Sequence, residues 1–175
     1  AFIAACGKGQ KDVVQLLLNC PDNNIELNAR KDCNGFTAFI MACNNGHKDV
    51  VQLLLDHSDR IELNARANNG WTAFMLACND GHNNVVKLLL DNFERIELNA
   101  RTNHGRTAFM IALQCGHKDV VKLLIENSNI DLQARSNRGN TAFMIACELG
   151  HKDVVQWLLD RSERIELNTK ANDGW

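Results

Sequence analysis

Four histidines recur along the chain, and histidine is both a metal ligand and a general base. Each follows a glycine, and successive copies are separated by 35, 35 and 34 residues: His47, His82, His117 and His151. This spacing indicates one histidine in each copy of a repeated unit. Stacked helical units lie about 8–10 Å apart, which is too far for ligands that share one ion. We therefore predict a structural role for these histidines and expect no metal site.

The seven cysteines include no Cys-x-x-Cys pair, which argues against a zinc ribbon. Four share one slot of the repeated unit, where the fourth copy has Leu113 instead: Cys6, Cys43, Cys78 and Cys147. Equivalent positions on adjacent units exceed the Cα separation of about 7 Å that a disulfide allows, so we expect buried free thiols in this slot. Free thiols suggest a reducing compartment, which makes a cytoplasmic or otherwise intracellular location our expectation.

Cys115 falls outside that slot, in a predicted turn between helices, and we expect thiol reagents to reach it. A catalytic cysteine needs an adjacent base, and the one nearby, His117, is better explained by its place in the repeat. The segment Gly7-Lys8-Gly9 lacks the rest of a phosphate-binding loop, and no nucleophile elbow or His-Glu-x-x-His motif is present. We expect no catalytic residue, no cofactor and no enzymatic activity.

Composition narrows the partner classes. The formal net charge is -2, aromatic residues make up 6% of the chain, and tyrosine is absent, so neither general electrostatics nor stacking rings favour nucleic acid. No apolar run reaches the roughly 18 residues of a membrane-spanning helix. We expect no nucleic-acid partner and no direct insertion into a membrane.

One unit recurs through the whole sequence and must position all of these residues. The pattern Gly-x-Thr-Ala-Phe begins at Gly35, Gly70, Gly105 and Gly139, at steps of 35, 35 and 34 residues. Gly-His, Val-Val and a Leu-rich run follow in each copy. A truncated copy opens the chain at Phe2, and a further copy begins near its end.

Each unit is predicted to form two short helices. Thr37 is a candidate N-cap for the first, in which Phe39, Ala42 and Cys43 define one apolar face, and Gly46 ends it. The second begins near His47 and buries its valines and leucines. Neither helix can bury its apolar face alone, so neighbouring pairs must stack into an extended array.

These motifs resemble the ankyrin repeat, whose unit reads Gly-x-Thr-Pro-Leu-His-x-Ala, then Gly-His, Val-Val, Leu-Leu and Val-Asn-Ala. The resemblance covers essentially the whole chain, although Thr-Ala-Phe-Met replaces Thr-Pro-Leu-His and the period is about 35 residues. It implies an all-α solenoid of stacked helical hairpins with β-hairpin-like fingers between repeats. The expected units are 1–30 (truncated), 31–65, 66–100, 101–134, 135–169 and 170–175, which starts a further repeat.

The resemblance also implies roles for individual residues. Histidine at the Gly-His position ties the start of the second helix to neighbouring backbone. Some family members are hydroxylated on the asparagine that closes each unit, which corresponds to Asn64, Asn99 and Asn168, with Gln133 in one copy. Whether these asparagines are modified is left open.

Ankyrin repeats bind proteins through the finger tips and the exposed part of the first helix, and a partner should read the positions that differ between copies. The candidate partner-binding residues are Phe36, Trp71, Arg106, Arg138, Asn69, His104, Asn140, Asn45, Asp80, Gln114 and Leu149. Phe36 and Trp71 place large rings in consecutive units. They are either interface anchors or local core packed on the neighbouring finger. Trp175 would occupy the same slot.

Charge is sorted along the unit, with eight basic residues and two acidic ones in the fingers, Asp32 and Asp173. The predicted partner is therefore a protein segment that carries acidic and apolar residues. Arg30, Arg66, Arg101 and Arg135 recur in register, however, so some of this charge could serve the finger itself.

Two alternatives stay open. The chain could be the recruitment or regulatory part of a larger enzyme or channel, because both end copies look truncated. End-to-end self-association would cover the bare apolar faces of these copies. Binding of nucleic acid by the basic fingers is a weaker alternative, which a steep salt dependence would reveal.

Overall fold

The computed structural model describes residues 1–20, 25–31, 33–166 and 170–172. Within these residues the chain forms ten α-helices and one short 3-10 helix, η1 (Ser162–Arg164). The first helices of the pairs are α1 (Phe2–Gly7), α3 (Ala38–Asn44), α5 (Ala73–Asn79), α7 (Ala108–Cys115) and α9 (Ala142–Glu148). The second helices are α2 (Lys11–Leu18), α4 (Lys48–Asp56), α6 (Asn83–Asp91), α8 (Lys118–Glu126) and α10 (Lys152–Leu159).

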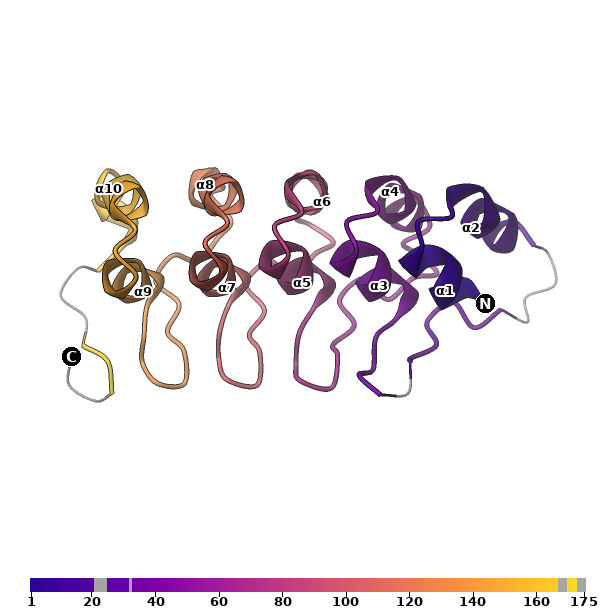
Figure 1. Cartoon of the computed structure of the whole chain (residues 1–175), viewed down its shortest axis with the longest axis horizontal. Helices are drawn as coiled ribbons and strands as arrows, with labels where there is room; N and C mark the ends of the chain where they lie inside the picture. The colour runs from indigo at the N-terminus through magenta and orange to yellow at the C-terminus, as the bar shows by residue number, and fades with distance from the viewer. Residues whose placement is uncertain (21–24, 32, 167–169, 173–175) are drawn as a thin grey trace.

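The helix pairs stack side by side in two rows, with the first helices in one row and the second helices in the other (Figure 1). Loops extend from the side opposite the second helices, between successive pairs. This arrangement confirms the prediction of a solenoid of stacked helical hairpins.

Threonine begins four of the first helices, as predicted for Thr37. Its hydroxyl accepts a hydrogen bond from the backbone N–H of Ile40, three residues into the helix, at 3.3 Å. Thr72, Thr107 and Thr141 make the same cap, and all four threonines are buried. A buried hydroxyl that satisfies a helix N-terminus fixes where each pair begins.

A single apolar core runs through all the pairs. Phe39, Phe74 and Phe109 are at most 2% exposed and belong to a core cluster that includes residues from every pair. Phe143, the equivalent in α9, is only partly buried. The core is therefore tighter in the middle of the array than at α9.

The loops between pairs form four fingers, which we number finger 1 (30–36), finger 2 (66–71), finger 3 (101–106) and finger 4 (135–140). A backbone hydrogen bond closes each one, such as Ala67 N–H to the Trp71 carbonyl at 2.8 Å. A positive-φ glycine stands before the last residue, for example Gly70 at φ 80°. The described residues contain no β-strand, so the fingers are hairpin-like turns without a ladder.

One part of the cysteine prediction is wrong. Cys6, Cys43 and Cys78 are fully buried, and burial raises the pKa of the Cys6 thiol to about 12 and the pKa of the Cys43 thiol further. Cys147 holds the same slot in α9 but is exposed, because no described helix pair packs on that side of it. A cysteine in this slot is buried only where a following helix pair packs against it, so its position in the repeat does not by itself predict burial.

Candidate functional site

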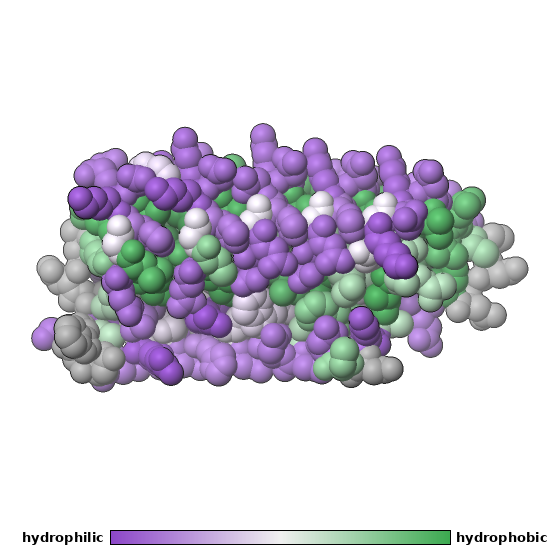
Figure 2. All heavy atoms as spheres, in the orientation of Figure 1, coloured by the Kyte–Doolittle hydropathy of each residue, from purple (hydrophilic) through white to green (hydrophobic). Residues whose placement is uncertain are grey.

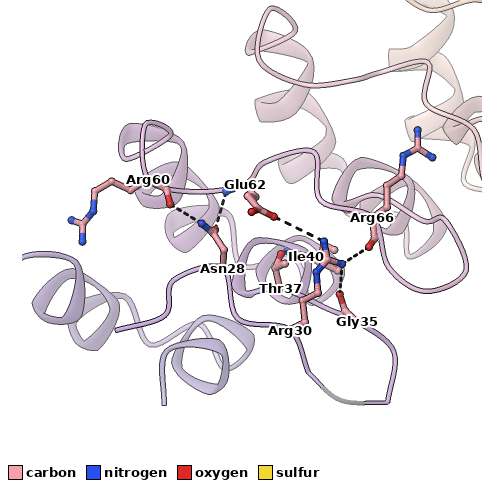
Figure 3. Close-up of polar contacts among 8 residues, drawn as sticks. All are labelled: Asn28, Arg30, Gly35, Thr37, Ile40, Arg60, Glu62 and Arg66. Atoms are coloured by element: carbon pink, nitrogen blue, oxygen red, sulfur yellow. Dashed lines mark hydrogen bonds and ion pairs between the residues drawn. The ribbon is translucent and has the colours of Figure 1, made fainter. Parts of the chain in front are cut away.

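The first arginine of each finger is an internal staple. Arg30 donates through Nη1 to the carbonyl oxygen of Arg66 at 2.6 Å, and its Nη2 lies 3.9 Å from a carboxylate oxygen of Glu62 (Figure 3). Arg66 repeats both contacts one finger further on. Arg101 and Arg135 likewise donate to the carbonyls of Arg135 and Lys170. The suspicion that the recurring arginines serve the fingers themselves is confirmed.

Asparagines that close the repeats form a second set of ties. Asn28 donates through Nδ2 to the Arg60 carbonyl at 3.0 Å and accepts from the Glu62 N–H at 2.9 Å, which joins consecutive outer loops (Figure 3). Asn64 and Asn99 bond in the same way. The amide groups of Asn64 and Asn99, the candidate hydroxylation residues within the described part of the chain, are thus engaged in the fold.

The histidines hold the pairs together, as the resemblance implies. Each Nε2 faces a carbonyl oxygen at the end of the preceding first helix. The pairs are His47 with Gly7 (3.0 Å), His82 with Asn44 (2.8 Å), His117 with Asn79 (2.7 Å) and His151 with Leu113 (3.2 Å). Because a carbonyl oxygen only accepts, Nε2 carries the proton in each bond.

The last of these contacts is out of register. By position in the repeat, His151 should bond to Gln114, but it bonds to the residue before it. A Cβ placed on Gly46 or Gly81 would lie 2.6 or 2.7 Å from the next histidine ring, whereas one on Gly116 would meet nothing within 4 Å. The junction between α7 and α9 therefore differs from the others, and α7 is one residue longer than α5.

Two different hydrogen bonds lock the finger turns. In fingers 1 and 2 the tip asparagine does so, since Oδ1 of Asn69 accepts from the Trp71 N–H at 3.1 Å, and Asn34 does the same for Phe36. In fingers 3 and 4 a hydroxyl at the base accepts instead. The bonds are Arg106 N–H to the Thr102 hydroxyl (3.2 Å) and Asn140 N–H to the Ser136 hydroxyl (3.2 Å).

In fingers 3 and 4 the hydroxyl bond at the base stabilises the turn, so the tip residue does not have to accept a hydrogen bond. His104 and Arg138 stand where Asn34 and Asn69 stand in the first two fingers, and both are exposed. Sequence reasoning missed the hydroxyl locks. The signal was available, because a hydroxyl residue opens the turn in the two copies that lack a tip asparagine.

The structure brings five of the predicted partner-binding residues together in one hollow. We call it the polar pocket; its volume is about 400 Å3, and it lies between fingers 3 and 4. Its lining residues are His104, Arg106, Gln114, Ser136, Asn137, Arg138 and Asn140. All of these lining residues have polar side chains, and two of them are arginines.

Arg106 is half-buried in the wall of this pocket. Its Nη1 donates to Oε1 of Gln114 at 2.6 Å, whereas its Nε is buried without any hydrogen-bond partner among the described residues. Asn137 is fixed to finger 3, since its Nδ2 donates to the Asn103 carbonyl at 3.0 Å. The pocket therefore combines fixed walls with guanidinium donors that are not all satisfied.

The other predicted residues lie apart from this pocket. Phe36 and Trp71 are half-buried and pack against the core, so each ring is partly local packing. Asn45 donates to the Gly7 carbonyl at 2.6 Å, and Asp80 accepts from Asn79 at 2.7 Å. Leu149, at the end of α9, is 46% exposed. Asp32, Asn168, Asp173 and Trp175 lie outside the described residues.

Polar residues dominate the face shown in Figure 2, and apolar residues reach the surface mostly toward its two ends. The exposed apolar side chains include Val13 and Leu16 on α2, and Leu149 and Leu159 near the other end. In the part of the chain that the structure describes, no helix has the length and apolar character to cross a membrane.

The environment of Cys115 does not favour a nucleophile. The residue is the last of α7 rather than part of a turn, and its exposed thiol donates to Oδ1 of Asn79. Partial desolvation and the nearby Asp80 carboxylate raise the pKa of the thiol, which Arg106 only partly offsets. The described residues hold no cluster of three or more His, Cys, Asp or Glu that could bind a metal.

Comparison with known proteins agrees with this architecture. The family model described as ankyrin repeats (3 copies) matches residues 1–102, 59–136 and 94–171, which together span nearly the whole chain. A search of curated proteins gave no match. Ankyrin repeats are generally protein–protein interaction modules and typically not catalytic. Helix pairs capped by threonine, tied by histidine and joined by stapled fingers fit the same description, and the chain belongs to the ankyrin-repeat family.

Proposed function

We propose that this chain binds a segment of another protein that carries acidic and apolar residues. The binding site is the finger surface, which consists of the exposed side chains of fingers 1 to 4 and the C-terminal ends of α3, α5, α7 and α9. The observation that carries the proposal is the polar pocket, because it gathers Arg106, Arg138 and His104 on that surface.

The hydrogen bonds distinguish arginines that stabilise the fold from arginines that are available to a partner. The first arginine of every finger is stapled to the next finger, so these guanidiniums mainly hold the array together. Arg106 and Arg138 interrupt this regularity and share one hollow. Two arginines in one pocket favour a local acidic feature on a protein over the extended phosphate backbone of a nucleic acid.

An apolar contribution comes from the neighbouring fingers. Trp71 is half-buried, so its inner side stabilises the core while its exposed part remains available to a partner. Tryptophan and arginine are the residue types that most often dominate binding energy at interfaces. On the finger surface, Trp71 of finger 2 can therefore make apolar contacts, and Arg106 and Arg138 of fingers 3 and 4 can pair with acidic side chains.

The test begins with isolation of binding proteins by affinity capture and mass spectrometry, followed by calorimetry with the purified binding segment. We expect the triple variant W71A/R106Q/R138Q to weaken binding by at least about a hundredfold. The matched control is F93A/K87Q/K122Q, which removes one exposed ring and two exposed positive charges from the second-helix side. Equal binding by wild type and the triple variant would refute the proposal.

A further inference from the structure

The junction between α7 and α9 contains the polar pocket and the histidine contact that is out of register. We infer that this pocket is a specific subsite for a carboxylate side chain, glutamate or aspartate, of the bound protein segment. The inference rests on the proposed function and assigns part of the finger surface to one kind of side chain.

The guanidinium of Arg106 is oriented by the protein itself. Its Nη1 is held by Gln114 at 2.6 Å, which leaves Nη2 to donate to a carboxylate that enters the pocket. Nε has no acceptor among the described residues and is shielded from solvent, so a ligand oxygen pairs with it only after the side chains that cover it move. A buried donor without an acceptor is unfavourable, which favours such a movement when a carboxylate binds.

The surroundings favour an anion of this size. Arg138 contributes a second exposed guanidinium, and Asn140 and Ser136 add neutral polar groups to the wall. The helix ends on either side carry the carboxylates Asp80 and Glu148, whereas Gln114 between them is neutral. The pocket thus lacks an internal carboxylate that would compete for Arg106.

The equivalent positions on fingers 1 and 2 offer no guanidinium to such a ligand. Phe36 and Trp71 occupy the position of Arg106 and pack against the core, and Asn34 and Asn69 are used at the tips to lock the turns. In fingers 3 and 4 the Thr102 and Ser136 hydroxyls replace that lock, which allows basic side chains at the tips. The subsite therefore arises from coordinated differences between copies of one repeat.

Direct binding to the pocket is tested by NMR on the isotopically labelled 175-residue chain. The probe is a capped hexapeptide with two central glutamates, and its counterpart carries glutamines instead. We expect saturable shifts of the Arg106 Nε–H signal and of backbone amides in fingers 3 and 4 with the glutamate peptide. Equal shifts with the glutamine peptide would overturn the assignment.

Variants test whether the two arginines act specifically. R106Q/R138Q is expected to raise the Kd for the glutamate peptide by at least about tenfold. K31Q/K48Q, which removes the same charge from exposed residues outside the pocket, is expected to change it less than about twofold. Equal losses in the two variants would show general charge attraction and refute the subsite.

Inorganic phosphate distinguishes a carboxylate site from a phosphate site. We expect phosphate to compete with the glutamate peptide only weakly, and tighter saturable binding of phosphate would overturn the carboxylate assignment. The subsite and the proposed function can fail separately. If the natural binding segment is lost from W71A but retained by R106Q/R138Q, the finger surface stands and the subsite is refuted.

Discussion

Fingers 1 and 2 differ from fingers 3 and 4 in the hydrogen bond that stabilises an otherwise similar turn. The tip asparagines Asn34 and Asn69 accept it in the first two, and the base hydroxyls of Thr102 and Ser136 accept it in the last two. Moving the acceptor to the base leaves the tip open to any polar side chain. The difference shows that a tip position becomes free for other side chains when another residue takes over its structural bond.

The same two regions differ in how their pairs stack. His82 and His117 bond to equivalent positions at the ends of α3 and α5, whereas His151 bonds one residue earlier on α7. The step between repeats is 34 residues at this point, and the polar pocket lies there. Four experiments test this contrast between the middle of the array and its α9 side.

Core truncation should produce the largest difference. Phe109→Ala is expected to lower the free energy of unfolding by about 3–5 kcal/mol, because a ring that is 1% exposed leaves a cavity. Phe143→Ala, in the equivalent position of α9, should cost less than half as much, since that ring is only partly buried. Urea titration followed by circular dichroism measures both, and equal losses would contradict the difference in core packing.

Removing the inter-repeat histidines should have the next largest effect. His117→Ala is expected to destabilise by about 1–3 kcal/mol, because it leaves the Asn79 carbonyl without its donor at 2.7 Å. His151→Ala removes a longer contact of 3.2 Å at the shifted junction and should cost less. The reverse order in urea titrations would show that the shifted contact is the stronger one.

Exchanging the finger locks tests whether the tip and base acceptors are interchangeable. Thr102→Val keeps the shape of a buried side chain but removes its hydroxyl, and should lower stability by about 1 kcal/mol. His104→Asn in the same chain restores a tip acceptor, so the double variant should recover most of that loss. Thr102→Ser, which keeps the hydroxyl, is the control in thermal unfolding, and a double variant no more stable than Thr102→Val would argue against interchangeable locks.

Thiol reactivity is the mildest test, because it leaves the fold unchanged. With a thiol reagent and mass mapping of the native protein, Cys147 should react while Cys43 and Cys78 stay protected. The pKa of the Cys147 thiol is raised by partial desolvation, so its thiolate is scarce at neutral pH and the rate should still be rising above pH 9. Protection of Cys147 in the monomeric chain would show that another surface covers the slot.

Much of this fold follows from the sequence alone. The period places the helix pairs, and Thr37 and its equivalents mark the starts of α3, α5, α7 and α9. The resemblance of the Gly-His motif to the family implies the inter-repeat bonds. Periodicity encodes these features where they recur, whereas the first pair and the shifted His151 contact depart from the pattern.

The candidate site was only partly predictable from the sequence, because it depends on the places where one repeat differs from the others in its packing. The 34-residue step is visible in the sequence, where three residues, 127–129, precede Ile130 and four residues, 92–95, precede Ile96. The shifted contact of His151 is not visible there, because packing decides which carbonyl the ring reaches. Likewise the sequence shows Arg106 in a slot held elsewhere by Trp71, but not that Gln114 would hold one edge of its guanidinium.

The arginine staples have a mechanical consequence. Each one reaches from its own finger to the next and no further, so a load applied along the array is carried by a series of separate short links. Under tension the repeats should unfold one at a time, beginning with a repeat that has a neighbour on one side only. The array would then behave as an extensible spring whose elements open and re-form individually.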